Sequence, residues 1–175
     1  MRIEVDRLEE FGDRFSEVCS PEEVQLNDRD ARLIKAAELR GEIDRDGQEI
    51  ELRGRVSTEI EVPCDRCLKN VALPIDTAFD ARFVPSVSWG SSLEHELGED
   101  DLKLSVFDGQ AIELRDLARE EILLAIPSHV LCREDCKGLC QVCGGDLNTV
   151  DCNCGDEQVD PRWSALKDLR NLFGE

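Results

Sequence analysis

Polar and apolar residues alternate along the middle of the chain. From Ile50 to Val62 the even positions are apolar or small, with one threonine, and the odd positions are charged or polar. A second alternating run extends from Val71 to Phe83 and contains Pro74 near its start. A period of two residues predicts a β-strand with one buried face. Because proline has no N–H to donate, we expect an open edge beside the start of the second strand.

A weaker alternating run precedes these two, from Leu33 to Ile43. It is joined to the first long run by the sequence DRDGQ, whose Asp46-Gly47 pair is typical of a β-hairpin turn. Three consecutive strands with short connections predict an antiparallel β-meander.

Helical spacing occurs mainly after this meander. Apolar residues from Leu114 to Ala125 recur every three or four positions, and Pro127 provides a stop. We expect this helix to pack against the sheet. A short terminal helix is predicted in DPRWSALKDLRNLF, with Pro161 in its first turn. Near the other end, Phe11, Phe15 and Val18 suggest one more helix.

Residues 86–101 carry five acidic side chains and no lysine or arginine, which predicts an exposed, mobile loop. Residues 102–106 and 111–114 then predict a further short strand, or a hairpin around Asp108-Gly109. The expected fold class is therefore α+β: an antiparallel β-meander with packed helices and a C-terminal, cysteine-rich, zinc-ribbon-like module. We expect the β domain to span residues 1–127 and the cysteine-rich module residues 128–175.

The composition limits the partners. The 175 residues include 40 acidic and 21 basic side chains, a net charge of −19, and no basic run suited to phosphate backbones. Direct RNA binding is therefore disfavoured, and basic proteins are more natural partners. Nothing resembles a secretory signal and no 18-residue apolar run occurs, so we expect a cytoplasmic protein without a membrane segment.

Two groups of cysteines carry the candidate chemistry. The sequence CDRC, with Cys64 and Cys67, lies between the two long predicted strands and hence at a hairpin tip. A redox-active pair gains its reactive thiolate at the start of a helix, whereas a metal knuckle uses a tight turn. The hairpin setting favours metal, with two ordinary reduced thiols as the alternative.

The second group places six cysteines between Cys132 and Cys154, with the spacing C-x3-C-x3-C-x2-C-x8-C-x-C. Few apolar residues accompany them, so thiolate coordination of Zn²⁺ would supply the missing folding energy. In the cytoplasm such thiols stay reduced, and the total of nine cysteines fits poorly with paired disulfides. Glycines at positions 138, 144 and 145 allow tight turns beside sulfur.

Counting thiols suggests how they group. Six are too many for one tetrahedral ion and too few for two, but adding the hairpin pair makes eight. Our preferred hypothesis is two sites, and Cys19 is left over. The first site would contain Cys64, Cys67, Cys132 and Cys136, and the second Cys140, Cys143, Cys152 and Cys154. The rival is a single local site of Cys132, Cys136, Cys140 and Cys143, and spacing does not decide between them. His95 and His129 are weaker candidate ligands.

Four motifs together resemble one family. They are CDRCL, EEILLAIP, LCREDCKGLCQVCGGDLN followed by CNC, and DPRWSALKDL. Over residues 33–173 the chain resembles the YceD family, the large ribosomal RNA subunit accumulation proteins of bacteria and plastids. Gln141 departs from the proline common at that position. Because some members lack the second cluster, the resemblance implies that metal stabilises a subset of the family.

The resemblance implies a role in accumulation of 23S ribosomal RNA and in biogenesis of the large subunit. The acidic charge favours ribosomal proteins or pre-ribosomal particles as partners over direct capture of RNA. The resemblance offers no catalytic residue, and the sequence shows no nucleophile–base set, phosphate-binding loop or site for a small-molecule substrate. We therefore expect a non-enzymatic factor with one or two zinc ions. The alternatives are a thiol redox switch or redox-gated chaperone, and an RNA-binding zinc ribbon, which the charge opposes.

Overall fold

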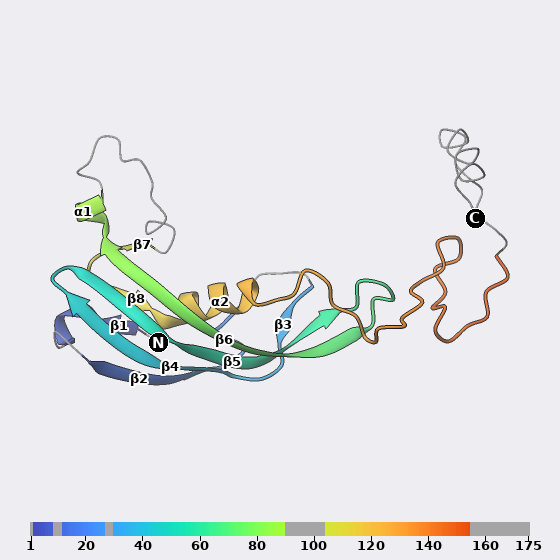
Figure 1. Cartoon of the computed structure of the whole chain (residues 1–175), viewed down its shortest axis with the longest axis horizontal. Helices are drawn as coiled ribbons and strands as arrows, with labels where there is room; N and C mark the ends of the chain where they lie inside the picture. The colour runs from blue at the N-terminus through green and yellow to red at the C-terminus, as the bar shows by residue number, and fades with distance from the viewer. Residues whose placement is uncertain (1, 9–11, 27–29, 90–103, 155–175) are drawn as a thin grey trace, which may run out of the picture.

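A computed structural model of the chain describes residues 2–8, 12–26, 30–89 and 104–154 (Figure 1). The predicted terminal helix after Pro161, His95 and most of the predicted acidic loop lie outside these ranges. The elements, in chain order, are β1 (Arg2–Glu4), the 3-10 helix η1 (Val5–Arg7), β2 (Asp13–Cys19), β3 (Arg32–Leu33), β4 (Ala37–Asp46), β5 (Glu49–Pro63), β6 (Asn70–Pro85), α1 (Ser86–Trp89), β7 (Leu104–Phe107), β8 (Ala111–Glu113) and α2 (Leu114–Leu124).

The predicted antiparallel meander is confirmed and forms the centre of the main sheet. The strand order is β2-β4-β5-β6-β7, and β3 pairs with β5 beside this path. The turn between β4 and β5 contains Gly47 with a φ of 60°. At Pro74 the described part of the sheet has only β5 beside β6, because β7 pairs with β6 at Arg82–Pro85 alone. Proline therefore occupies an open edge, as predicted.

The short strands predicted around Asp108-Gly109 are present as β7 and β8, but the hairpin alternative and the helix predicted near Phe15 and Val18 are wrong; Phe11 lies outside the described residues. Phe15 and Val18 lie in strand β2, because the segment pairs with β4 from Asp13↔Ile43 to Cys19↔Ala37 and takes its backbone bonds from the sheet. Strands β7 and β8 do not form a hairpin with each other. Instead β7 pairs in parallel with β6, and β8 pairs with β1 in a separate two-stranded sheet.

The turn at Asp108 explains the second correction. Its carboxylate accepts hydrogen bonds from the backbone N–H groups of Gln110 (2.8 Å) and Ala111 (3.2 Å), and Gly109 adopts a φ of 82°. Side-chain bonds of this kind replace the cross-strand bonds of a two-residue hairpin. The chain therefore leaves one sheet and enters the other.

The core lies on one face of the main sheet, where the alternating residues of β4, β5 and β6 are buried. Leu39, Leu52, Val56 and Ile60 are all inaccessible to solvent. Helix α2 covers part of this face, as predicted, and buries Leu114, Leu117, Ala118 and Ile122. Leu124 at the end of the helix points to solvent and is 80% exposed. Cys19, the cysteine outside the predicted sites, is buried in this core.

Strands β5 and β6 form a hairpin much longer than the rest of the sheet. They have 15 and 16 residues and stay in register from Ile50↔Phe83 to Pro63↔Asn70. Strand β4 accompanies β5 only as far as Ser57, so the hairpin extends beyond the meander. In Figure 1 the chain after α2 runs to the tip of this hairpin and continues past it. The fold thus brings two distant cysteine-bearing segments to one end of the molecule.

Candidate metal centres

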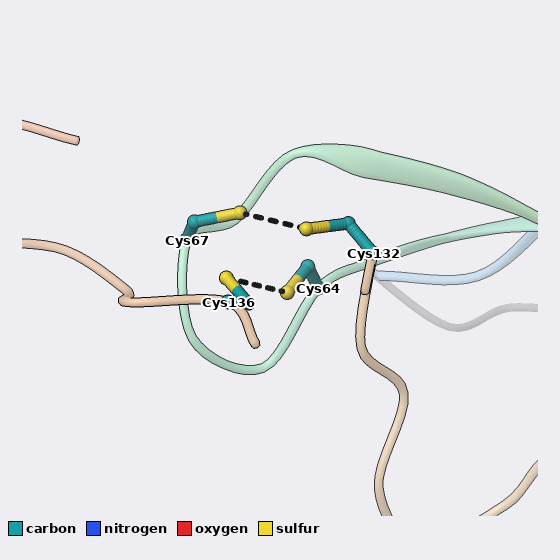
Figure 2. A group of neighbouring side chains, drawn as sticks. All are labelled: Cys64, Cys67, Cys132 and Cys136. Carbon is teal, nitrogen blue, oxygen red and sulfur yellow. Dashed lines mark hydrogen bonds between the residues drawn. The ribbon is translucent and has the colours of Figure 1, made fainter. Parts of the chain in front are cut away.

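The first group of thiols lies at the tip of the β5–β6 hairpin. Cys64 and Cys67 come from the hairpin loop, and they face Cys132 and Cys136 from the segment that follows α2 (Figure 2). The four sulfurs all lie within 4.8 Å of one another. The Sγ atoms of Cys64 and Cys136 are 3.9 Å apart, and those of Cys67 and Cys132 are 3.6 Å apart. Three of the four residues are buried, and Cys132 is exposed.

Backbone and side-chain hydrogen bonds hold the segment after α2 against the hairpin loop. Asp65 donates its N–H to the carbonyl of Val130 (2.9 Å), and its carboxylate accepts the N–H of Val130 (2.7 Å). Arg66 donates from Nη1 to the carbonyl of Cys136 (2.8 Å), and its own carbonyl accepts the N–H of Leu139 (3.1 Å). Both residues inside CDRC therefore fasten the second segment, which places its sulfurs opposite Cys64 and Cys67.

Gly138 completes this contact. Its φ of 76° lies in the left-handed region, and a Cβ atom added there would lie 3.1 Å from the carbonyl oxygen of Arg66. Two features of this position therefore favour glycine: its positive φ and the close approach of the two segments.

The second group consists of Cys140, Cys143, Cys152 and Cys154, whose sulfurs also lie within 4.8 Å of one another. The Sγ atom of Cys152 is 3.4 Å from that of Cys140 and 3.6 Å from that of Cys143. Cys143 and Cys154 are exposed and the other two are half-buried. The second group is therefore much more open to solvent than the first.

The CxxC sequences of the two groups have the same backbone structure. Cys64 donates its N–H to the carbonyl of Lys69 (2.8 Å) and accepts at its own carbonyl the N–H of Leu68 (2.9 Å). Cys140 makes the equivalent bonds with Gly145 (2.8 Å) and Gly144 (2.9 Å). The residue after the second cysteine has a positive φ in both cases, 59° at Leu68 and 71° at Gly144. We call each of these segments, 64–69 and 140–145, a knuckle.

Knuckle geometry also lowers the pKa of the leading cysteine. Hydrogen bonds from the backbone N–H groups of Cys67 and Arg66 within the knuckle, and of Cys132 across from it, bring the pKa of Cys64 to about 6, against the opposing effect of burial. The N–H groups of Cys143 and Val142 do the same for Cys140, whose pKa is also about 6. Backbone amides that point at sulfur stabilise the thiolate, which is the form that binds metal.

The donor set and its spacing fit a tetrahedral zinc ion. Four thiolates at a Zn–S distance of about 2.3 Å have sulfurs about 3.8 Å apart. Two sulfur pairs in each group are 3.4–3.9 Å apart, close to this value, and all other pairs lie within 4.8 Å. None of the nine cysteines forms a disulfide. Both groups, which we call the first and the second tetrad, therefore have the ligands and the spacing of a structural zinc site.

The eight sulfurs form the same two groups of four that the two-site hypothesis predicted. The rival local set is divided, since Cys132 and Cys136 belong to the first tetrad, and Cys140 and Cys143 to the second. His129 is not part of either group; its Nδ1 lies 3.6 Å from the carboxylate of Asp65 and the side chain is largely exposed. Metal binding by the eight cysteines stays a prediction, as do the zinc-ribbon likeness of the module and the boundary at residues 127 and 128.

Sequence reasoning missed three residues beside the tetrads. Asn148 donates from Nδ2 to the sulfur of Cys136 (3.4 Å) and to Oδ1 of Asp146 (2.6 Å). Lys69 forms an ion pair of 2.7 Å with the other carboxylate oxygen of Asp146. Together with the hydrogen bonds from Asn148, Lys69 holds the pKa of Asp146 at about 2. Asp146 and Asn148 belong to the polar segment GGDLN between two cysteines. From the sequence alone, such residues cannot be told apart from ordinary turn formers.

The fold and these centres define a class of protein: a β-sheet protein with two cysteine tetrads suited to structural metal. Residues 52–170 match the model of the family described as large ribosomal RNA subunit accumulation protein YceD. The chain belongs to this family, as its motifs predicted.

Three relatives illustrate the range of the family. The chain is 26% identical over 156 residues to a protein of Bacillus subtilis called uncharacterized protein YlbN. The aligned region covers 89% of this chain and 86% of the relative. An uncharacterized protein of Mycobacterium tuberculosis is 31% identical over 116 residues, 66% of this chain and 53% of the relative. The large ribosomal RNA subunit accumulation protein YCED homolog 1, chloroplastic, of Arabidopsis thaliana is 27% identical over 150 residues, 74% of this chain and 47% of the relative. No solved structure matches the chain.

Proposed function

We propose that this chain is a non-enzymatic factor that promotes accumulation of 23S ribosomal RNA and biogenesis of the large ribosomal subunit. The observation that carries the proposal is the family match over residues 52–170, whose description names accumulation of large-subunit RNA. The name of the Arabidopsis relative uses the same words for that protein.

Zinc in this proposal is structural. The eight thiolates of the two tetrads would hold two ions, with no coordination position left open for a substrate. Bound zinc would supply folding energy to a segment with little apolar surface of its own. The first tetrad would also fix that segment to the hairpin, since it takes two ligands from each.

Charge supports protein partners over direct contact with RNA. The chain has a net charge of −19. Many arginines on the outer face of the sheet are paired with carboxylates, such as Arg14 with Glu42 (3.1 Å) and Arg55 with Asp76 (2.9 Å). A carboxylate beside a guanidinium offsets its positive charge and so weakens its attraction for a phosphate. We therefore place basic ribosomal proteins, within pre-ribosomal particles, as the direct partners.

We also propose a cytoplasmic location, the compartment in which clustered thiols stay reduced. None of the helices in the described ranges combines the length and apolar character that a membrane crossing requires.

The test is complementation in bacteria that lack their own family member. The intact chain should restore the ratio of 23S to 16S ribosomal RNA and the peak of mature large subunits in sucrose gradients. Variants Cys64→Ser and Cys140→Ser, each expressed at a matched level, separate the tetrads. A normal RNA ratio in cells without the protein would contradict the proposal. Affinity capture of the chain, scored for ribosomal proteins and for RNA after nuclease treatment, tests the nature of the partner.

A redox switch is the second candidate, and the exposed thiols of Cys143 and Cys154 favour it. Peroxide would take two electrons from a pair of thiolates, forming a disulfide and releasing the ion they held. If this is the function, complementation by the Cys140→Ser variant should fail only during oxidative stress. Failure of that variant in unstressed cells would favour the structural role.

A further inference from the structure

Three polar side chains connect the loops of the two tetrads. Lys69 is the last residue of the first knuckle, and Asp146 and Asn148 lie between Cys143 and Cys152 of the second tetrad. We call these three residues the polar bridge. Each of them bonds to another member, through the ion pair of 2.7 Å between Lys69 and Asp146 and the bond of 2.6 Å between Asn148 and Asp146.

Asn148 is the contact with the first tetrad. Besides its bond to the sulfur of Cys136, its Oδ1 accepts the N–H of Lys137 (2.8 Å) and a hydrogen bond from Arg133 (2.7 Å). Arg133 lies between Cys132 and Cys136, and Lys137 directly follows them. A single amide side chain therefore orients one ligand of the first tetrad and the loop that carries its neighbour.

Asp146 is the contact with the second tetrad. Its backbone pairs with Leu139 in a β-bridge, and the adjacent Gly145 accepts the N–H of Cys140 at 2.8 Å. The carbonyl of Asp146 also accepts the N–H groups of Thr149 and Val150, both at 3.0 Å, on the way to Cys152. Its position thus depends on the fold of the loop that holds the second tetrad.

Lys69 connects the β5–β6 hairpin to the other two residues of the polar bridge. Its carbonyl accepts the N–H of Cys64 in the first knuckle, while its ammonium group reaches Asp146. Lys69 therefore contacts both loops, the first knuckle through its backbone carbonyl and Asp146 through its side chain, and it makes both contacts only when both loops are in place.

We propose that the polar bridge is a positioning device that couples the two tetrads, so that metal at one tetrad raises the affinity of the other. This inference rests on the metal binding proposed above. Residues that orient metal ligands through hydrogen bonds change metal affinity about 10–100-fold when they are replaced. Ordering of Asp146 and Asn148 by one ion removes part of the entropic cost of ordering the loop for the second ion, which is positive coupling.

Cobalt titrations of the reduced, full-length chain measure this coupling, because thiolate-bound Co²⁺ has charge-transfer and d–d absorption bands. The affinity of the first tetrad is compared between the intact chain, with the second tetrad filled, and the Cys140→Ser variant. Coupling predicts an affinity at least about 5-fold higher in the intact chain. The reciprocal comparison uses Cys64→Ser and should give the same factor, since binding linkage is symmetric.

The bridge variants are Asn148→Ala and Lys69→Met, each tested with and without Cys140→Ser. Both should bring the coupling factor close to one, and Asn148→Ala should also lower the affinity of the first tetrad about 10-fold. Asn70→Ala and Lys35→Met are matched controls. Asn70 donates to Glu61 and Lys35 pairs with Glu59, so both lie outside the bridge and should leave the factor unchanged.

Cadmium-113 NMR gives a second measurement. A purely structural role of the polar bridge would not change the resonances in the pattern described next. Each CdS4 site gives its own resonance, and Asn148→Ala should shift the first-tetrad resonance while Asn70→Ala does not. Independent filling of the two tetrads in the intact chain, or full coupling in Asn148→Ala, would overturn the inference. Failure of the intact chain to bind cobalt at all would instead overturn the metal proposal, and the coupling with it.

Discussion

At the scale of single residues, the two knuckles show one backbone structure built with different side chains. The position after the second cysteine requires a positive φ, which the second knuckle meets with Gly144 and the first with Leu68. Left-handed backbone costs an L-residue roughly 1–2 kcal/mol. Leu68 recovers little of this by burial, because its side chain is 62% exposed.

Replacement of Leu68 by glycine should therefore raise the free energy of unfolding of the metal-bound protein, by up to about 1 kcal/mol after the entropic cost of glycine is subtracted. Chemical denaturation monitored by circular dichroism measures the change. Val142→Gly is the control, because that exposed residue of the second knuckle has an ordinary φ and should lose stability. A loss of stability in Leu68→Gly would show that the leucine makes contacts worth more than its strain.

At the scale of elements, the meander depends on a pair of glycines in adjacent strands. Gly41 of β4 and Gly54 of β5 pair directly and are flanked by Phe15 of β2 and Phe79 of β6 in the same row. The aromatic rings lie over the glycines with their centroids 6.4 Å apart. The alternating pattern assigned Gly54 to the buried face but gave no reason for a glycine there. The reason is the close approach of strand β4 together with the rings, since a Cβ atom at Gly54 would meet the carbonyl oxygen of Arg40 first and the ring of Phe79 next.

A methyl group at Gly54 should destabilise the sheet by about 1–3 kcal/mol, the usual cost of overpacking a core. The added Cβ would lie 2.8 Å from the ring of Phe79 and 2.9 Å from the Cα of Gly41, closer than real contacts allow. Thermal denaturation of Gly54→Ala measures the loss. Ser57→Ala in the same strand points to the other face and should change stability by less than about 0.5 kcal/mol. Equal effects of the two substitutions would contradict this account.

Metal removal should divide the β5–β6 hairpin into two regions. The strands have a core of their own around Leu52, Val56 and Phe79, whereas the hairpin tip is held mainly by the first tetrad and by Asp65. After chelation, hydrogen exchange should become faster at residues 63–70 and 128–154 and stay slow at residues 50–57 and 75–83. Loss of protection along the whole hairpin would mean that the sheet itself depends on metal.

At the scale of the whole molecule, the segments that carry the tetrads lie at the tip of the β5–β6 hairpin and beyond it, far from the β1–β8 sheet (Figure 1). The tetrads also differ in protection. The first is buried apart from Cys132, and the second has two exposed and two half-buried cysteines. Solvent access controls how readily a chelator or oxidant attacks bound thiolates.

Zinc release should therefore occur in two phases, with about one ion lost rapidly from the second tetrad and about one slowly from the first. A colorimetric zinc indicator, used with a competing chelator or with peroxide, records both phases. Cys140→Ser should lack the fast phase. A single phase in the intact chain, or a fast phase that survives in Cys140→Ser, would contradict the assignment.

The Cys64→Ser variant tests how many segments build the first tetrad. It should lower zinc content by about one ion and leave the second tetrad filled. Elemental analysis gives the content, and mass spectrometry of alkylated peptides shows whether Cys132 and Cys136 become reactive. Unchanged zinc content would show that the hairpin thiols do not bind metal.

The sequence by itself determined the features that depend on neighbours along the chain. Alternation defined β5 and β6, helical spacing defined α2, and the position of CDRC between two strands predicted a knuckle at a hairpin tip. These signals are reliable because a strand or helix repeats its burial every two or about 3.6 residues. The family resemblance also rested on local motifs.

Tertiary structure decided which segments distant in sequence lie beside one another. It made Phe15 part of an edge strand and sent β7 and β8 to different sheets, because backbone groups in these short segments bond to partners far away in sequence. It also chose between two groupings of thiols that spacing left open. The bonds of Asp65 with Val130 and of Arg66 with Cys136 bring segments about 65–70 positions apart into contact. No local periodicity encodes such contacts, since they depend on where the long hairpin ends and where the chain leaves α2.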